Sequence, residues 1–268
     1  MENKKKTQKI EKVSKPYLTG DMFDRTTLGS AVKFFFGMIG MTVAFVIFCV
    51  MLNFDQDWLN LVVNLAFALG FYVFYAQFGM NAGADAVNQG EIMFARQEKG
   101  RPVAQWEQSM CYHPLKGLMG ALIGSIPFVL CALILALVAE RQMTSLGALP
   151  AWVSGLEGRE EIGPAIAYYH DGGKVTIETI TRLLTRMSIM PYVNMVGASD
   201  MDAMLTLERV SPVLNLLPAL FYGLGYMQGV GVRTSVHTNI ALGKKKAKRK
   251  QAKERRARTQ RKTPNQLN

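Results

Sequence analysis

The chain has 268 residues, of which 49% are hydrophobic, and it carries a formal net charge of +11 at pH 7. Its apolar residues are gathered into long blocks, whereas a soluble helical domain spreads them at amphipathic spacing. This distribution argues against a soluble domain and indicates an integral membrane protein.

Four stretches run for more than 20 residues each without a charged side chain: Phe34–Phe54, Trp58–Ala84, Gly117–Ala139 and Val210–Val232. A bilayer core about 30 Å thick is crossed by roughly 20 helical residues, so each stretch is long enough to span it. The predicted fold class is therefore all-α: a polytopic integral membrane protein with a four-transmembrane-helix bundle and an extracytoplasmic helical segment. Predicted spans 31–54, 58–84, 117–139 and 210–232 alternate with a leader (1–30), a loop (85–116), a connecting segment (140–209) and a tail (233–268).

Positive charge is concentrated at the two ends of the chain. Residues 1–33 hold eight Lys/Arg and four acidic residues, and residues 233–268 hold thirteen Lys/Arg and one acidic residue. Residues 140–209, in contrast, hold six basic and nine acidic residues. Because short cytoplasmic segments are enriched in Lys and Arg, we expect both termini on the cytoplasmic side of the cell (plasma) membrane and residues 140–209 outside.

Between the spans, the sequence predicts one helical extension and several solvated segments. We expect the basic leader to be loosely ordered, and the second span to continue as a cytoplasmic helix to about Arg96, before Gly100 and Pro102. The charged residues of this loop are expected to be solvated; they are Asp85, Glu91, Arg96, Glu98 and Arg101.

The connecting segment contains one amphipathic stretch, Lys174–Met190, which predicts a helix on the outer surface. Its charged side is an i,i+4 ladder of Glu178, Arg182 and Arg186. Ser199 followed by Asp202 resembles a capping box, which predicts the start of a helix leading into the fourth span. The apolar side of the amphipathic stretch is formed by Ile177, Ile180, Leu183, Leu184, Met187 and Met190.

The second span carries a stripe of amide side chains, which we call the polar stripe: Asn60, Asn64, Gln77 and Asn81. At 100° per residue these positions, together with Gly70, fall within about 140° of arc. Uncharged amides in lipid need partners, so we expect the stripe to face the other helices. It is either a hydrophilic path or substrate site, or a set of interhelical hydrogen bonds. The lack of ionisable residues in the predicted spans favours hydrogen bonding.

Small residues form a second pattern, one pair in each span: Gly37/Gly40, Gly79/Gly83, Gly120/Gly124 and Gly225/Gly229. Glycine lets helix backbones approach closely, so we expect these residues to be helix-packing positions. With the predicted topology, each pair lies in the cytoplasmic half of its helix. We therefore expect a bundle that is narrow on the cytoplasmic side and wider outside.

The tail is strongly basic, with twelve Lys/Arg among the nineteen residues of Lys244–Lys262. It could contact anionic lipid, at about 1 kcal/mol per residue near the surface, bind RNA phosphates, or remain solvated and set the topology. No aromatic residues interleave with the charges, so sequence-specific nucleic-acid recognition is not expected. Anionic-lipid contact combined with topology is favoured, through Lys244, Lys245, Lys246, Lys248, Arg249 and Lys250.

Sequence signatures of catalysis are missing. The chain has no His-Glu-x-x-His, no Gly-x-Ser-x-Gly and no phosphate-binding Gly-Lys-Ser/Thr motif. We expect no metal, cofactor or catalytic residue, and interpret Cys49, Cys111 and Cys131 as small apolar fillers. The acid–base candidates of the outer segment are Glu160, Glu161, His170 and Asp171.

Three hypotheses for the function remain, and no family is recognised. The leading hypothesis is a non-catalytic multi-pass membrane protein that acts through helix association, as an oligomer or as a subunit of a membrane complex. The alternative is a small transporter or permease subunit that uses the polar stripe. The third is an enzyme at the outer membrane face, using the acid–base candidates named above.

Overall fold

The structure, a computed structural model, describes residues 12–51, 54, 56–140, 151–156, 158–171, 177–197 and 200–261. These residues form helices and no strand, which confirms the predicted all-α class. The α-helices are α1 (Arg25–Met51), α2 (Asp57–Glu98), α3 (Gln105–Gln108), α4 (Lys116–Val138), α5 (Gly163–Asp171), α6 (Ile177–Ser188), α7 (Met190–Val196), α8 (Met201–Met227) and α9 (Gly229–Arg261), and η1 (Ala151–Leu156) is a 3₁₀ helix.

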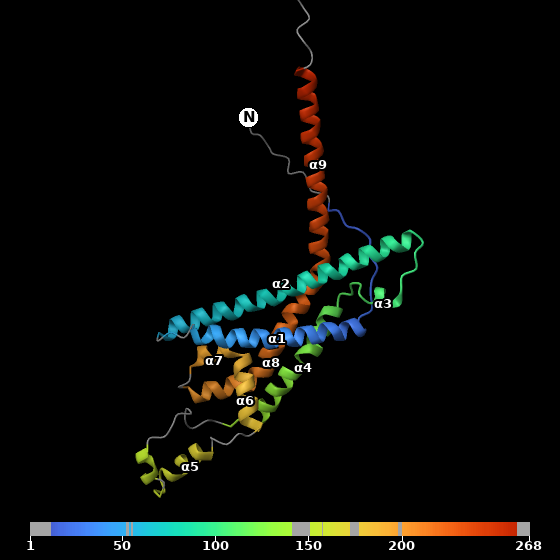
Figure 1. The fold of residues 1–268 in the computed structure, drawn as a ribbon. Helices are drawn as coiled ribbons and strands as arrows, with labels where there is room; N and C mark the ends of the chain where they lie inside the picture. The colour runs from blue at the N-terminus through green and yellow to red at the C-terminus, as the bar shows by residue number, and fades with distance from the viewer. Residues whose placement is uncertain are drawn as a thin grey trace, which may run out of the picture.

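Among the described residues, four helical segments are long and apolar enough to cross a membrane; they are Arg25–Cys49, Trp58–Glu98, Lys116–Val138 and Met201–Arg256. They correspond to α1, α2, α4 and to α8 together with the greater part of α9, which follows it. In the bundle, α4 packs against α1 and α8, and α8 also packs along α2 (Figure 1). We call the end where α1 and α4 begin and α9 departs the tail end, and the opposite end, with α6 and α7, the far end.

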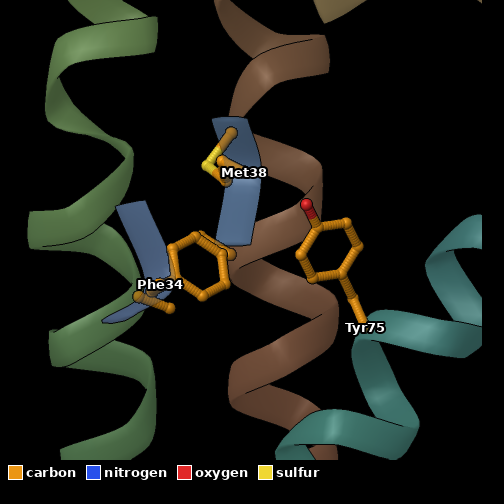
Figure 2. Close-up of a cluster of buried hydrophobic side chains, with 5 residues drawn as sticks. Phe34, Met38 and Tyr75 are labelled. Atoms are coloured by element: carbon orange, nitrogen blue, oxygen red, sulfur yellow. The ribbon is translucent and has the colours of Figure 1, made fainter. Parts of the chain in front are cut away.

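The bundle is held together by aromatic and small side chains. A buried cluster joins all four helices through Phe34, Met38, Tyr75, Ala121 and Ala219. Figure 2 shows Tyr75 reaching from α2 toward Phe34 and Met38 of α1, beside α8. The outer faces of the same helices expose large apolar side chains such as Phe36, Val73 and Leu137, as expected of helices surrounded by hydrocarbon.

The helix boundaries differ from the predicted spans in the first and fourth spans. α1 begins at Arg25, within the predicted leader. The predicted span 210–232 is divided, because α8 ends at Met227 and α9 begins at Gly229 after the break at Gln228. As predicted, α2 continues beyond the uncharged stretch, to Glu98.

α8 begins earlier than the predicted fourth span, at Met201. Its N-cap is Asp200, whose carboxylate accepts a 2.9 Å hydrogen bond from the amide of Ala203. The capping residue is therefore not Ser199, which lies outside the described residues.

The described part of the leader, residues 12–24, is docked onto the bundle instead of being loosely ordered. The amide of Leu18 donates to the carbonyl of Gly90 (3.1 Å), and the amide of Gly20 donates to that of Tyr112 (3.0 Å). Tyr17 also meets Tyr112 edge-on, with ring centroids 6.1 Å apart. These contacts tie the N-terminal segment to the tail end.

Candidate functional site

A group of charged side chains links α6 to α8, and it is centred on the buried Glu208. We call Glu178, Arg182, Arg186 and Glu208 the ion cluster. Glu208 Oε1 accepts hydrogen bonds from Nε of Arg182 (3.0 Å) and Nε of Arg186 (2.8 Å). Arg182 also pairs with Glu178 at 2.9 Å, one turn earlier on α6. The Glu208 side chain is only 2% exposed. Two basic and two acidic groups leave the cluster without net charge, which lowers the cost of burying it.

The ion cluster reverses the usual orientation of an amphipathic helix. On α6, Thr181 and Thr185 are buried and the charged ladder beside them is partly buried, while Ile177 and Leu183 are 75% and 61% exposed. The sequence predicts this helix on an outer surface, but the structure packs its polar side against α4, α1 and α8. The periodicity correctly predicts two faces; it does not indicate which one is buried.

The chain turns sharply after α6, and the turn is inserted between the long helices. Ser188 Oγ, at the end of α6, donates a 2.8 Å hydrogen bond to Oδ1 of Asn215 on α8. Ile189 and Pro191 follow and are buried. At the next residue, the hydroxyl of Tyr192 lies 2.6 Å from that of Tyr72 on α2. We call residues 188–192 the hairpin tip.

A small cavity of about 30 Å³ lies beside the hairpin tip, between α1, α2 and α8. One water needs roughly 10–15 Å³ by this kind of measure, so there is room for one or two. Asn215 lines the cavity, is 3% exposed, and has a side-chain amide nitrogen with no protein partner. A buried donor of this kind needs an acceptor, and a water in the cavity would supply one.

The polar stripe does not stay together in the structure. Asn64 is fully buried and donates to the carbonyl (2.8 Å) and the side-chain oxygen (2.7 Å) of Asn60. Asn60 in turn donates to the carbonyl of Asn194 in α7 (2.8 Å). Gln77 and Asn81, nearer the tail end, are exposed on the surface of α2. Only the half of the stripe near the far end therefore faces other helices.

The paired glycines also divide into two sets. A Cβ added to Gly79 would overlap the backbone of Tyr222, and one added to Gly225 would overlap that of Ala76. The helices α2 and α8 therefore approach as closely as glycine allows. Gly83, Gly124 and Gly229 are equally restricted, and Gly120 lies at ordinary contact distance from α1. Gly37 and Gly40 have no atom within 4 Å of such a Cβ and are exposed on α1.

A second polar group, which we call the tail-end cluster, holds α9 against α2. Glu91 Oε1 lies 2.7 Å from Nε2 of His237, and its Oε2 accepts from Nε of Arg233 at 3.2 Å. Arg233 also donates to Asn88. The Glu91 side chain is 8% exposed, so the prediction that it is solvated is wrong. Its partners are separated from it by more than 140 residues in sequence, and no local pattern indicates the contact.

The remaining candidates do not form a reaction centre within the described residues. Glu160 and Glu161 are exposed, and the side chains of His170 and Asp171 lie outside the described part of the structure. Among the residues that the structure describes, no three or more His, Cys, Asp or Glu side chains are grouped so that they could hold a metal ion. Burial raises the pKa of the Cys111 thiol, which favours its protonated, unreactive form.

The basic residues of the tail lie on α9, which leaves the bundle as a long helix (Figure 1). All six predicted lipid-contacting residues are exposed; they are Lys244, Lys245, Lys246, Lys248, Arg249 and Lys250. At 100° per residue their side chains surround the helix axis, so a flat surface can meet only some of them at once.

Comparison of the chain with protein-family models, with curated proteins and with solved structures finds no match.

Proposed function

We propose that this chain is a non-catalytic multi-pass membrane protein that acts through helix association, as an oligomer or as a subunit of a membrane complex. The observation that supports this function is the free glycine face of α1. Glycines at close backbone contacts hold α2 and α8 together, whereas Gly37 and Gly40 point away from the chain's own helices. A helix of another chain could approach α1 there as closely as α8 approaches α2.

The proposal includes an orientation in the membrane. Both termini, the tail end and α9 are placed on the cytoplasmic side of the cell membrane, and the far end outside. The charge distribution supports this orientation. Residues 233–268 hold thirteen Lys/Arg and one acidic residue, whereas residues 140–209 hold six Lys/Arg and nine acidic residues.

Replacement of Gly37 and Gly40 by Leu tests the association. The double variant should lose most of its self-association or its co-purified partner in mild detergent, with unchanged thermal stability of the single chain. Gly70→Leu is the matched control, because Gly70 is also exposed and free of contacts but lies on α2. A strictly monomeric wild-type particle, or a double variant that associates as well as wild type, would refute the proposal.

A small transporter is the second candidate function, and the cavity beside the hairpin tip favours it. That cavity offers the side-chain amide nitrogen of Asn215, which has no protein partner, and the Tyr72–Tyr192 hydroxyl pair within the bundle. Under this proposal, Asn64→Leu and Asn215→Leu should abolish uptake in reconstituted vesicles, while Gln77→Leu should not, because Gln77 is exposed. A role in packing alone predicts lower stability for the two buried variants and no change in permeability.

A further inference from the structure

The hairpin tip lies beside the middle of the long helices. Four of its residues, Ser188, Ile189, Pro191 and Tyr192, line the same cavity as Ala68, Phe71 and Tyr72 of α2. Phe71 is the central residue of the uncharged stretch Trp58–Ala84, and it lies about 20 Å along the helix axis from Trp58. Since half of a bilayer core is about 15 Å thick, the tip reaches well beyond the interface if α2 spans the membrane.

Both legs of the hairpin return to the far end. Midway along the first leg, α6, Arg182 donates a 3.0 Å hydrogen bond to the carbonyl of Glu140, just beyond the end of α4. At the end of the second leg, Asn194 donates to the carbonyl of Cys49 (2.9 Å), near the end of α1. The chain thus enters the bundle with α6, turns at the tip and leaves with α7 on the same side.

The outer face of α6 is suited to hydrocarbon. Its exposed apolar side chains are Ile177, Ile180, Leu183 and Leu184, and its charged residues all take part in the ion cluster on the opposite face. In water, a helix with this pattern would bury its apolar side and expose its charges. The reversed arrangement is stable only where the surrounding medium is less polar than the protein interior at this point.

The apolar face of α6 also continues the outer surface of α4. The two helices pack together, and α4 exposes Leu130, Leu133, Ile134 and Leu137. With 12 residues, α6 is about 18 Å long, too short to cross a bilayer but long enough to enter one leaflet. Irregular backbone at membrane depth is tolerated when protein surrounds it, as it does at the buried Ile189 and Pro191.

We propose that residues 177–196 form a re-entrant hairpin that enters the bilayer from the far side, with the apolar face of α6 in contact with lipid acyl chains. Ile177 then lies near the lipid headgroups and Leu184 deeper in the leaflet. This gradient separates a re-entrant helix from one that lies flat on the membrane, since all exposed residues of a flat helix have similar depth.

Nitroxide labels on the full-length protein in phosphatidylcholine/phosphatidylglycerol vesicles test the hairpin. Single cysteines replace Ile177, Ile180 or Leu184 in a Cys131→Ser background, where the remaining Cys49 and Cys111 are buried. These three positions are exposed, so labels there should not disturb the packing. Leu130→Cys on α4 serves as the acyl-chain reference, and Trp106→Cys on α3, in the predicted cytoplasmic loop, serves as the water reference.

The accessibility of each label to oxygen, which concentrates in lipid, is compared with its accessibility to a water-soluble nickel chelate. The oxygen-to-nickel ratio should rise severalfold from Ile177 to Leu184 and approach that of Leu130 at the deep end. Three results would overturn the hairpin: nickel accessibility like that of Trp106, equal ratios along α6, or low accessibility to both reagents, which would mean that protein covers the face. Ile180→Cys gives an independent intermediate point.

Discussion

Glu208 of α8 and Arg182 of α6 form an ion pair with Oε1 and Nε 3.0 Å apart, and their side chains are only 2% and 12% exposed. The same Oε1 also accepts a hydrogen bond from Arg186. Glu208 lies two residues before the predicted fourth span, on the part of α8 that extends beyond it. One carboxylate of α8 therefore binds both arginines of α6 and helps to hold the hairpin that begins with this helix.

Glu208→Ala should destabilise the protein by about 3 kcal/mol, the lower end of the range for a broken buried ion pair, because Arg182 keeps its pair with Glu178 and the Arg186 side chain is 26% exposed. Unfolding of the detergent-solubilised protein by heat or denaturant measures the change. Glu178→Ala is the control: Glu178 is 31% exposed, and its partner Arg182 keeps Glu208, so its loss should cost about 1 kcal/mol or less. Equal effects of the two substitutions would contradict the central position of Glu208.

Gly79→Val should destabilise the bundle by about 1–3 kcal/mol or more, because the added side chain overlaps the backbone of Tyr222. Gly225→Val should do the same from the other side of the contact, against Ala76. Gly37→Val tests the opposite case, and should leave the stability of the single chain unchanged. Thermal unfolding in detergent separates the two sets, and a tolerant Gly79 would show that α2 and α8 do not meet in this way.

Glu91→Ala should release the first turns of α9 from α2, because Arg233 and His237 lose their shared carboxylate. Faster amide hydrogen exchange in residues 229–240, with the four-helix bundle still protected, is the expected readout. Glu98→Ala, an exposed position near the end of α2, serves as the matched control. Unchanged exchange in the Glu91 variant would mean that the tail-end cluster does not hold α9.

Replacement of Lys244, Lys245, Lys246, Lys248, Arg249 and Lys250 by Gln should weaken contact of α9 with anionic lipid. A fluorophore on Ala252→Cys in the full-length protein should be quenched by labelled headgroups in phosphatidylglycerol nanodiscs and not in phosphatidylcholine nanodiscs. Quenching should fall with the six substitutions, and also with added salt, since the Debye length is about 8 Å at 0.15 M ionic strength. Equal quenching in the two lipids would leave the tail without a role in lipid binding.

The long helices could be predicted from the sequence because each depends on a local property. Uncharged stretches of more than 20 residues indicate α1, α2, α4 and α8. The end of α2 follows from Gly100, whose φ of 71° is readily adopted only by glycine. The basic ends of the chain and the amphipathic spacing of α6 are likewise visible without a structure.

The polar contacts could not be predicted, since they join residues far apart in the sequence. Glu91 and His237 are separated by 146 positions, and Asn194 bonds to Cys49 across 145. The orientation of α6 could not be predicted either. Periodicity defines two faces of a helix, but it does not indicate which face packs against the rest of the protein. For the glycines, spacing alone cannot tell Gly79, which meets another backbone, from Gly37, which meets none.

The central claim is that hydrocarbon surrounds the four long helices. Membranes from cells expressing the full-length chain, washed with alkaline carbonate and then extracted with or without detergent, test it most directly. The protein should remain in the washed pellet and enter solution only with detergent, because the exposed faces of α1, α2, α4 and α8 are apolar. Release by carbonate as a monodisperse species in plain buffer would contradict the account.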